Sequence, residues 1–230
     1  LPYGTDVLLA VRYAEAADAC RRALRVRPKA ADLWHKLGVM CSYCERWEEA
    51  IDALEKAVAV DANHAQAHYF LGLAYRRMGR GSDALVHVEA AARLDPRDAT
   101  LQSGLGFLYA EAGQLPEAAR MYEAAIRLKA DDLDAHLALA TVLAGLGRDE
   151  DAVKSFRRVL QGNPDNGVAQ RGVGTAFKRL RRWKEAVEPL KRAVRQSPSD
   201  AELLFDLGEC LFRAGDWNAA NDIYKSLRPL

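Results

Sequence analysis

The sequence predicts an all-α protein built from a helical hairpin that recurs along the chain. A pattern centred on Leu71-Gly72, Gly79 and Ala84 returns in both directions when the sequence is shifted by 34 residues. Within each copy, apolar residues form bands suited to helices packed on more than one side, and Gly or Pro stands where most bands end. A fixed period of this length is typical of one supersecondary unit stacked many times.

The repeats follow one another without a gap. Five full units cover residues 31–64, 65–98, 99–132, 133–166 and 167–200. Residues 201–230 supply both helices of a further unit, and residues 1–30 are the remainder of a truncated first unit with Gly4 in register. Because no linker or low-complexity tract interrupts the pattern, we expect about seven units in one array over residues 1–230.

The first half of unit 65–98 predicts a helix and its end. Residues 69–75 carry a broad apolar band, which predicts the first helix of the hairpin. Gly79 is expected to end this helix in left-handed backbone, which glycine adopts without a Cβ clash. Ser82 or Asp83 is then expected to cap the second helix.

The second half of the unit predicts an antiparallel helix packed closely on the first. Ala84 and Ala91 are small where the two helices cross. Asp95-Pro96 ends the second helix, because proline cannot continue the hydrogen-bond ladder and disfavours helix in the residue before it. Neither helix can bury its band alone, so neighbouring units must stack.

Some units depart from the pattern at the turn between their helices. The glycine position is occupied by Glu45 in unit 31–64 and by Arg181 in unit 167–200. A tryptophan follows each of them, Trp47 and Trp183, and Trp217 takes the same position in the last unit. We expect these rings to pack at the helix turn rather than to stack on a ligand.

The repeated pattern resembles the tetratricopeptide repeat (TPR) family. The residues that carry the resemblance in unit 65–98 are Leu71-Gly72, Tyr75, Gly79, Ala84, Ala91 and Pro96. The resemblance implies a right-handed superhelical α-solenoid in which the first helix of each unit lines a concave groove. It also implies binding of a protein or peptide in that groove, although the chaperone-type clamp of Lys and Asn side chains is not reproduced here.

The same resemblance places candidate partner-binding residues at the second, fifth, ninth, twelfth and thirteenth positions of each unit. Ser42 and Tyr43 fall at these positions in unit 31–64. The candidates in the later units are Tyr69, Leu73, Arg76, Arg77, Phe107, Leu137, Thr141, Arg171, Thr175, Lys178, Arg179 and Arg213. They predict an apolar strip flanked by cations, which would fit a partner segment with apolar and acidic residues.

The overall composition excludes several classes of partner. The chain has 33 Lys and Arg against 32 Asp and Glu, a formal net charge of +1, which gives no general attraction to nucleic acid or anionic lipid. No apolar run is long enough to cross a bilayer. The N-terminal stretch lacks the basic region and cleavage site of a signal peptide, so we expect a cytoplasmic protein without direct membrane insertion.

Charge is nevertheless uneven along the chain. Residues 167–200 hold nine Lys and Arg against three Asp and Glu, whereas residues 31–64 hold three against seven. Seven of the basic residues crowd together: Arg171, Lys178, Arg179, Arg181, Arg182, Lys184 and Lys191. They form either a solvated basic surface or a docking patch for an acidic partner segment.

The residue types that often carry chemistry fit structural roles here. Cys41 and Cys44 form a lone C-x-x-C without the second ligand pair that zinc requires, and His68 and His136 take the position of Trp34, where packing explains them. No phosphate loop, nucleophile elbow or H-E-x-x-H motif is present. We therefore expect no catalytic residues, no metal and no cofactor.

These observations predict a non-catalytic scaffold or adaptor that binds a partner peptide or helix. Two alternatives remain open from the resemblance. The array could be the substrate-recognition or regulatory arm of a larger enzyme, as in some TPR-bearing glycosyltransferases. It could instead be a self-assembling, homo-oligomeric scaffold, as bacterial organelle-associated TPR proteins are.

Overall fold

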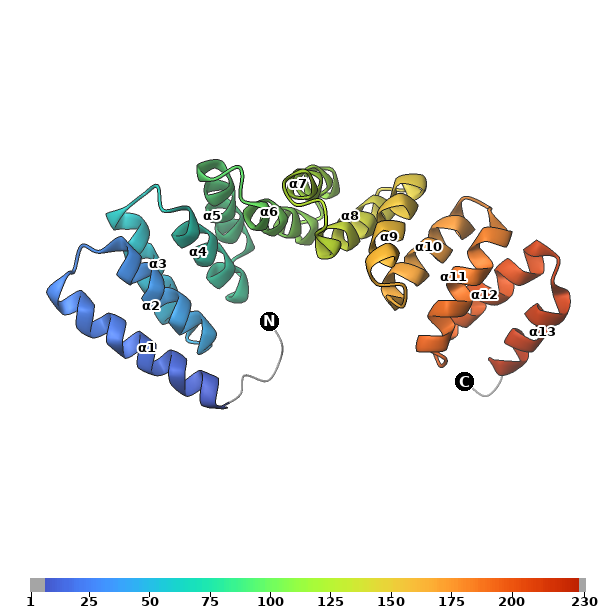
Figure 1. The fold of residues 1–230 in the computed structure, drawn as a ribbon, viewed down its shortest axis with the longest axis horizontal. Coiled ribbons are helices and arrows are strands. Elements are labelled where there is room, and N and C mark those ends of the chain that lie inside the picture. Colours follow the sequence, from blue (N-terminus) through green and yellow to red (C-terminus); the bar gives the residue numbers. More distant parts are fainter. Residues whose placement is uncertain (1–6, 228–230) are drawn as a thin grey trace. The chain divides into compact units, whose positions relative to one another are not determined.

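A computed structural model describes residues 7–227, which form thirteen helices and no strand (Figure 1). The ends of the two terminal units predicted from the sequence, including Gly4, lie outside the described residues. The chain divides into two compact units, Leu1–Ala112 and Gly113–Leu230. Below, 'the first unit' and 'the second unit' mean these two, whereas a repeat unit is always given with its residue range.

The first unit is a succession of helices that pack on their neighbours in chain order. The helix α2 also contacts α4, so the first helices of two successive hairpins lie side by side. The helices are α1 (Val7–Val26), α2 (Ala31–Tyr43), α3 (Trp47–Val60), α4 (Ala65–Arg77), α5 (Gly81–Leu94) and α6 (Ala99–Glu111).

The second unit repeats the same arrangement. Here α8 contacts α10, and α10 contacts α12, in addition to the packing of consecutive helices. The helices are α7 (Leu115–Leu128), α8 (Leu133–Gly145), α9 (Asp149–Gly162), α10 (Gly167–Arg179), α11 (Trp183–Gln196), α12 (Ala201–Ala214) and α13 (Trp217–Ser226). The predicted all-α solenoid is confirmed.

The hairpin between α4 and α5 shows why small residues recur at fixed positions. Ala84, Val88 and Ala91 on α5 are completely buried. A Cβ added to Gly72 on α4 would lie 2.5 Å from Val88 Cγ2 and 2.9 Å from the Ala84 carbonyl oxygen. The two backbones therefore approach more closely than a side chain at position 72 would allow.

The turns between paired helices use left-handed backbone, as predicted at Gly79, which has a φ of +74°. Glu45 and Arg181, which take the same position in their units, also have positive φ, +58° in each case. A residue with a Cβ is strained there by about 1–2 kcal/mol. The repeat therefore imposes this turn on whichever residue occupies it.

The prediction that Ser82 or Asp83 caps α5 is wrong. The helix begins at Gly81 with Arg80 as its N-cap residue, and no side chain accepts a bond from its first amides. The carboxylate of Asp83 instead accepts a bond from Nε of Arg80 at 2.7 Å. The same Arg-to-acid pair, three residues apart, joins Arg46 to Glu49, Arg148 to Asp151 and Arg182 to Glu185.

The fourth position of each full unit has a polar role that packing alone does not explain. Its side-chain nitrogen lies within hydrogen-bonding distance of the carbonyl oxygen six residues earlier, in the turn after the preceding helix. The pairs are Trp34 with Pro28, His68 with Ala62, Gln102 with Pro96, His136 with Ala130 and Gln170 with Pro164, at 2.8, 3.1, 3.4, 3.1 and 2.9 Å. The packing role predicted for His68 and His136 is therefore incomplete.

Candidate functional site

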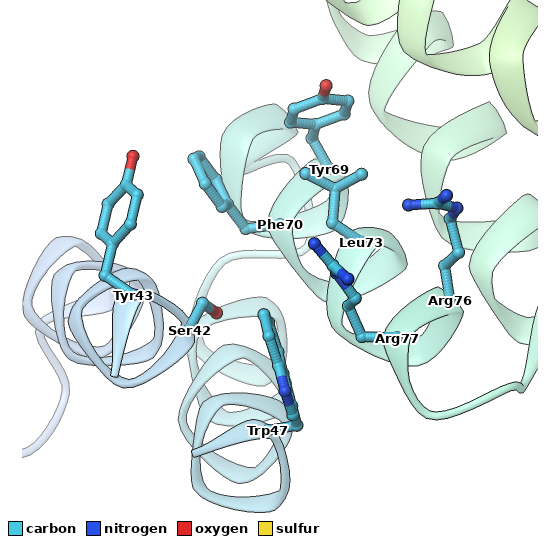
Figure 2. A pocket seen from close by; sticks show the side chains of 8 residues that line it. All are labelled: Ser42, Tyr43, Trp47, Tyr69, Phe70, Leu73, Arg76 and Arg77. Atoms are coloured by element: carbon cyan, nitrogen blue, oxygen red, sulfur yellow. The ribbon is translucent and has the colours of Figure 1, made fainter. Parts of the chain in front are cut away.

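The first unit contains a pocket of about 310 Å³ between the first helices of two successive hairpins. Residues from the end of α2, the start of α3 and the length of α4 line it. They are Ser42, Tyr43, Trp47, Tyr69, Phe70, Leu73, Arg76 and Arg77. Figure 2 shows Trp47 between Ser42 on α2 and Arg77 on α4. Four of the eight side chains are aromatic, so the lining offers large apolar surfaces with polar edges.

The two arginines of this pocket differ in their partners. Arg76 forms a two-bond ion pair with Glu111, at 2.6 and 2.9 Å, and its guanidinium lies 4.4 Å from the ring centroid of Phe107. The guanidinium of Arg77 lies 5.6 Å from the ring centroid of Trp47. No carboxylate among the described residues forms an ion pair with Arg77, so its donors face the pocket without an acidic partner.

The structure brings four of the predicted residues together here: Tyr69, Leu73, Arg76 and Arg77. Phe107, also predicted, is 39% exposed on α6 beside Arg76. Ser42 and Tyr43 fall at groove positions that were predicted for unit 31–64. The contributions of Trp47 and Phe70 were missed, because the tryptophan was assigned to packing at the turn.

Trp47 takes part in a contact that recurs between residues 30 positions apart in the sequence, and this recurrence would have identified it. In the first unit this spacing joins Tyr13 to Tyr43, whose rings stack with centroids 4.7 Å apart, and Trp47 to Arg77. The same contact between successive hairpins recurs in the second unit. There it joins Asp149 to Arg179 by an ion pair of 2.5 Å, and Trp183 to Arg213 by a cation–π contact of 5.8 Å.

Trp217 occupies the same position but has no such partner among the described residues. Its side chain is 69% exposed at the start of α13. The prediction that all three tryptophans pack at the helix turn is therefore wrong for Trp217. At the corresponding position of units 31–64 and 167–200, the tryptophan ring contacts an arginine 30 residues further on, in the next hairpin.

Several predicted residues of the second unit are not part of the lining of this pocket. Leu137 and Thr141 lie on α8, where the Thr141 hydroxyl donates to the Leu137 carbonyl oxygen at 2.9 Å. Thr175 is half-buried on α10. Arg171 bonds to Asp200 and to Glu202, both at 2.7 Å.

Lys178 is the centre of a partly buried ion cluster. Its ammonium lies 2.6 Å from Asp206 and 2.7 Å from Glu209, and the three side chains are 23%, 14% and 29% exposed. Burial alone would lower the pKa of Lys178, but its bonds to both carboxylates outweigh burial and raise that pKa to about 12. The lysine is thus charged, but its charge is already paired within the chain.

This cluster occupies the positions that leave a hollow in the first unit. Lys178 corresponds to Ser42, four repeats earlier, while Asp206 and Glu209 correspond to Phe70 and Leu73. The first unit therefore presents an apolar hollow where the second unit fills the same space with an ion cluster. This difference makes the pocket of α2, α3 and α4 the candidate binding site.

The two buried cysteines are in environments that disfavour thiolate chemistry. All four are free thiols, and Cys41 and Cys210 are buried. Burial raises the pKa of Cys41 and raises that of Cys210 to about 11, so both are protonated at neutral pH. Within residues 7–227, no group of three or more His, Cys, Asp or Glu side chains is arranged to hold a metal ion.

The fold and the repeat contacts define a helical-repeat solenoid, and the family models agree. The model of the Cilia and flagella-associated protein 70 C-terminal domain matches residues 6–172, and a Tetratricopeptide repeat model matches residues 174–229. The chain therefore belongs to the tetratricopeptide-repeat proteins, in the family of that C-terminal domain. No match was found among curated protein sequences.

Solved structures with the same fold are TPR proteins. YrrB, described as a TPR protein with an unusual peptide-binding site, is 23% identical with a TM-score of 0.76, over 82% of this chain and 97% of its own. MamA is 22% identical with a TM-score of 0.68, over 75% and 94%. PilF from Pseudomonas aeruginosa is 19% identical with a TM-score of 0.68, over 88% and 92%. At these identities the likeness establishes the fold.

No helix in the described part of the chain combines the length and the apolar character that a membrane span requires.

Proposed function

We propose that this chain is a non-catalytic interaction scaffold that holds a segment of a partner protein in the pocket of α2, α3 and α4. The observation that carries the proposal is a hollow lined by Tyr43, Trp47, Tyr69 and Phe70, which the described part of the chain leaves unfilled. A concave, largely apolar pocket with a few polar groups at its edge is the usual form of a binding site. The first helices of a TPR solenoid are also where such a partner is expected.

The pocket suits one apolar anchor side chain with a nearby acidic group. A volume of about 310 Å³ is at the lower end of the range for ligand sites, enough for a large aliphatic or aromatic side chain. Burying such a side chain contributes about 2 kcal/mol. Arg77, which lacks an acidic partner within the described residues, can bond a carboxylate with both arms of its planar fork.

The relatives are consistent with this role. YrrB is described as having a peptide-binding site, and its fold covers most of this chain. This supports peptide binding as the general activity, while the chemistry of the partner is argued from the pocket of this chain alone.

Selection from a displayed library of random peptides tests the proposal without a known partner. The enriched peptides are expected to share an apolar anchor next to an acidic residue. The substitution Ser42→Trp fills the hollow without changing the charge, and it should weaken a synthetic representative by about tenfold or more. Circular dichroism would verify that the variant folds.

Val86→Trp provides the matched control, because it adds the same side chain without changing the charge, and Val86 is 60% exposed on α5 of the same unit and does not line the pocket. Its affinity should stay near that of the wild type. A Ser42→Trp variant that binds the selected peptides as well as the wild type would contradict the proposed site.

A further inference from the structure

The basic residues of unit 167–200 are not equivalent in the structure. Five of the seven that crowd together in the sequence are paired with carboxylates of the second unit. These are Arg171, Lys178, Arg179, Arg182 and Lys191, with partner distances of 2.7, 2.6, 2.5, 2.6 and 3.4 Å. The two that remain, Arg181 and Lys184, form no ion pair with any described residue.

Both unpaired cations line a second pocket, which has a volume of about 310 Å³. It lies at the turn between α10 and α11 and is completed by the end of α12. Its lining consists of Arg181, Arg182, Trp183, Lys184, Glu185, Arg213 and Ala214. Arg213 also lacks an ion-pair partner among the described residues, so three unpaired cations converge on one hollow.

The single carboxylate of this lining does not neutralise those cations. Both oxygens of Glu185 are bonded to Arg182, each at 2.6 Å, and this pairing lowers the pKa of Glu185. Arg182 is bonded in addition to Glu150 at 3.1 Å. The charges of Arg182 and Glu185 therefore neutralise each other. Arg181, Lys184 and Arg213 then give the pocket a net positive charge.

The pocket also has an aromatic wall. The guanidinium of Arg213 lies 5.8 Å from the ring centroid of Trp183. Both side chains of this cation–π pair line the hollow. The same ring offers an apolar surface to the aliphatic stem of a bound acidic side chain.

We infer that this hollow, defined by Arg181, Trp183, Lys184 and Arg213, is a second docking site that binds an acidic segment of a protein partner. Charge complementarity selects this occupant: three unpaired cations spread around a hollow of this size fit carboxylates carried on neighbouring side chains. The inference is independent of the proposed function, which concerns the pocket of the first unit.

The charges predict how binding depends on salt and on residue type. Exposed cations attract an acidic segment over roughly a Debye length, so affinity should fall as ionic strength rises. Two of the three cations are arginines, whose planar forks match carboxylates bidentately, so substitution by lysine should only partly preserve affinity.

A fluorescein-labelled peptide of alternating Glu and Ala, compared with its Gln counterpart, tests the inference by fluorescence anisotropy. The wild type should bind the Glu peptide and not the Gln peptide. The triple variant Arg181→Gln, Lys184→Gln, Arg213→Gln should bind the Glu peptide about tenfold or more weakly. Circular dichroism of each variant would verify folding.

A matched variant keeps the change in net charge constant. Arg120, Arg127 and Arg195 are exposed on α7 and α11, line neither pocket and form no described ion pair, so replacing all three by Gln removes the same charge. This variant should bind like the wild type. Equal losses in both triple variants would mean diffuse electrostatic attraction and would overturn the site.

Two further readouts locate the contact and identify the ligand. The indole N–H resonance of Trp183, assigned through Trp183→Phe, should shift during titration. The indole N–H of Trp34, which donates to Pro28 in the first unit, should not shift. If inorganic phosphate displaces the peptide at equal concentration, the hollow binds small anions and the inference of a protein segment is wrong.

Discussion

Acidification should destabilise the protein through His35. This residue lies on α2 with its ring centroid 4.8 Å from that of His64 and 5.6 Å from that of Phe70. Its Nε2 atom is buried without a hydrogen-bond partner in the described part of the chain. Burial, followed by the nearby charge of His64, lowers the pKa of His35 from 6.5 to about 4.

The direction of the effect follows from this lowered pKa. Between pH 6.5 and about 4 the unfolded chain binds a proton at His35 that the folded protein does not bind. Stability from this residue is therefore complete above pH 6.5 and is lost as the pH falls towards 4. The gap between the two pKa values corresponds to about 3 kcal/mol, of which about 2 kcal/mol is expressed by about pH 5. Because His35 is only partly buried, solvent screening reduces the expected loss to about 1–2 kcal/mol.

The comparison of wild type with His35→Phe isolates this contribution. Phenylalanine keeps a ring against Phe70 and His64 but cannot be protonated. Urea denaturation at about pH 8 and about pH 5 would give the free energy of unfolding of each protein. The loss on acidification should be about 1–2 kcal/mol smaller in the variant. Burial also lowers the pKa of His87, which adds the same acid sensitivity to both proteins. Equal losses in the two proteins would refute the assignment to His35.

Two further predictions concern the turns and the ion cluster. Replacing either Glu45 or Arg181 by glycine should raise the free energy of unfolding by about 1 kcal/mol. Both residues have a φ of +58°, which glycine adopts without strain. An unchanged midpoint of urea denaturation would show that the turn is not strained. Replacing Lys178 by Met should lower the free energy of unfolding by about 2–3 kcal/mol, because two partly buried carboxylates lose their counter-ion. Adding Asp206→Asn to that variant should recover part of the loss, and a further loss in the same urea experiment would argue against the pairing.

Much of the fold could be predicted because the same requirements on packing and backbone conformation recur in each repeat. Gly72 is required by backbone contact with α5, and Gly79 by positive φ. The cap of α5 was not predictable in the same way. Asp83 has the right chemistry for a cap, but the helix begins at Gly81 and Arg80 binds the Asp83 carboxylate instead.

The candidate sites were predictable only in part. The groove positions that the resemblance to TPR proteins implied include Tyr69, Leu73, Arg76 and Arg77, and all four line the pocket. They did not identify Trp47, which belongs to the start of a second helix and reaches the pocket from a different element. The recurrence of an aromatic or charged residue 30 positions before its partner is a signal that single-helix periodicity does not contain.

The sequence by itself determined the class of this protein, since helical hairpins in a fixed period can bury their apolar bands only by stacking. It also determined that basic residues gather in unit 167–200. Tertiary structure decided which of those charges are available. Lys178 is paired with Asp206 and Glu209, whereas Arg181 and Lys184 meet Arg213 of the following repeat in one hollow. The physical reason is that ion pairing depends on distances of a few ångströms between helices, and these distances are set when the hairpins pack.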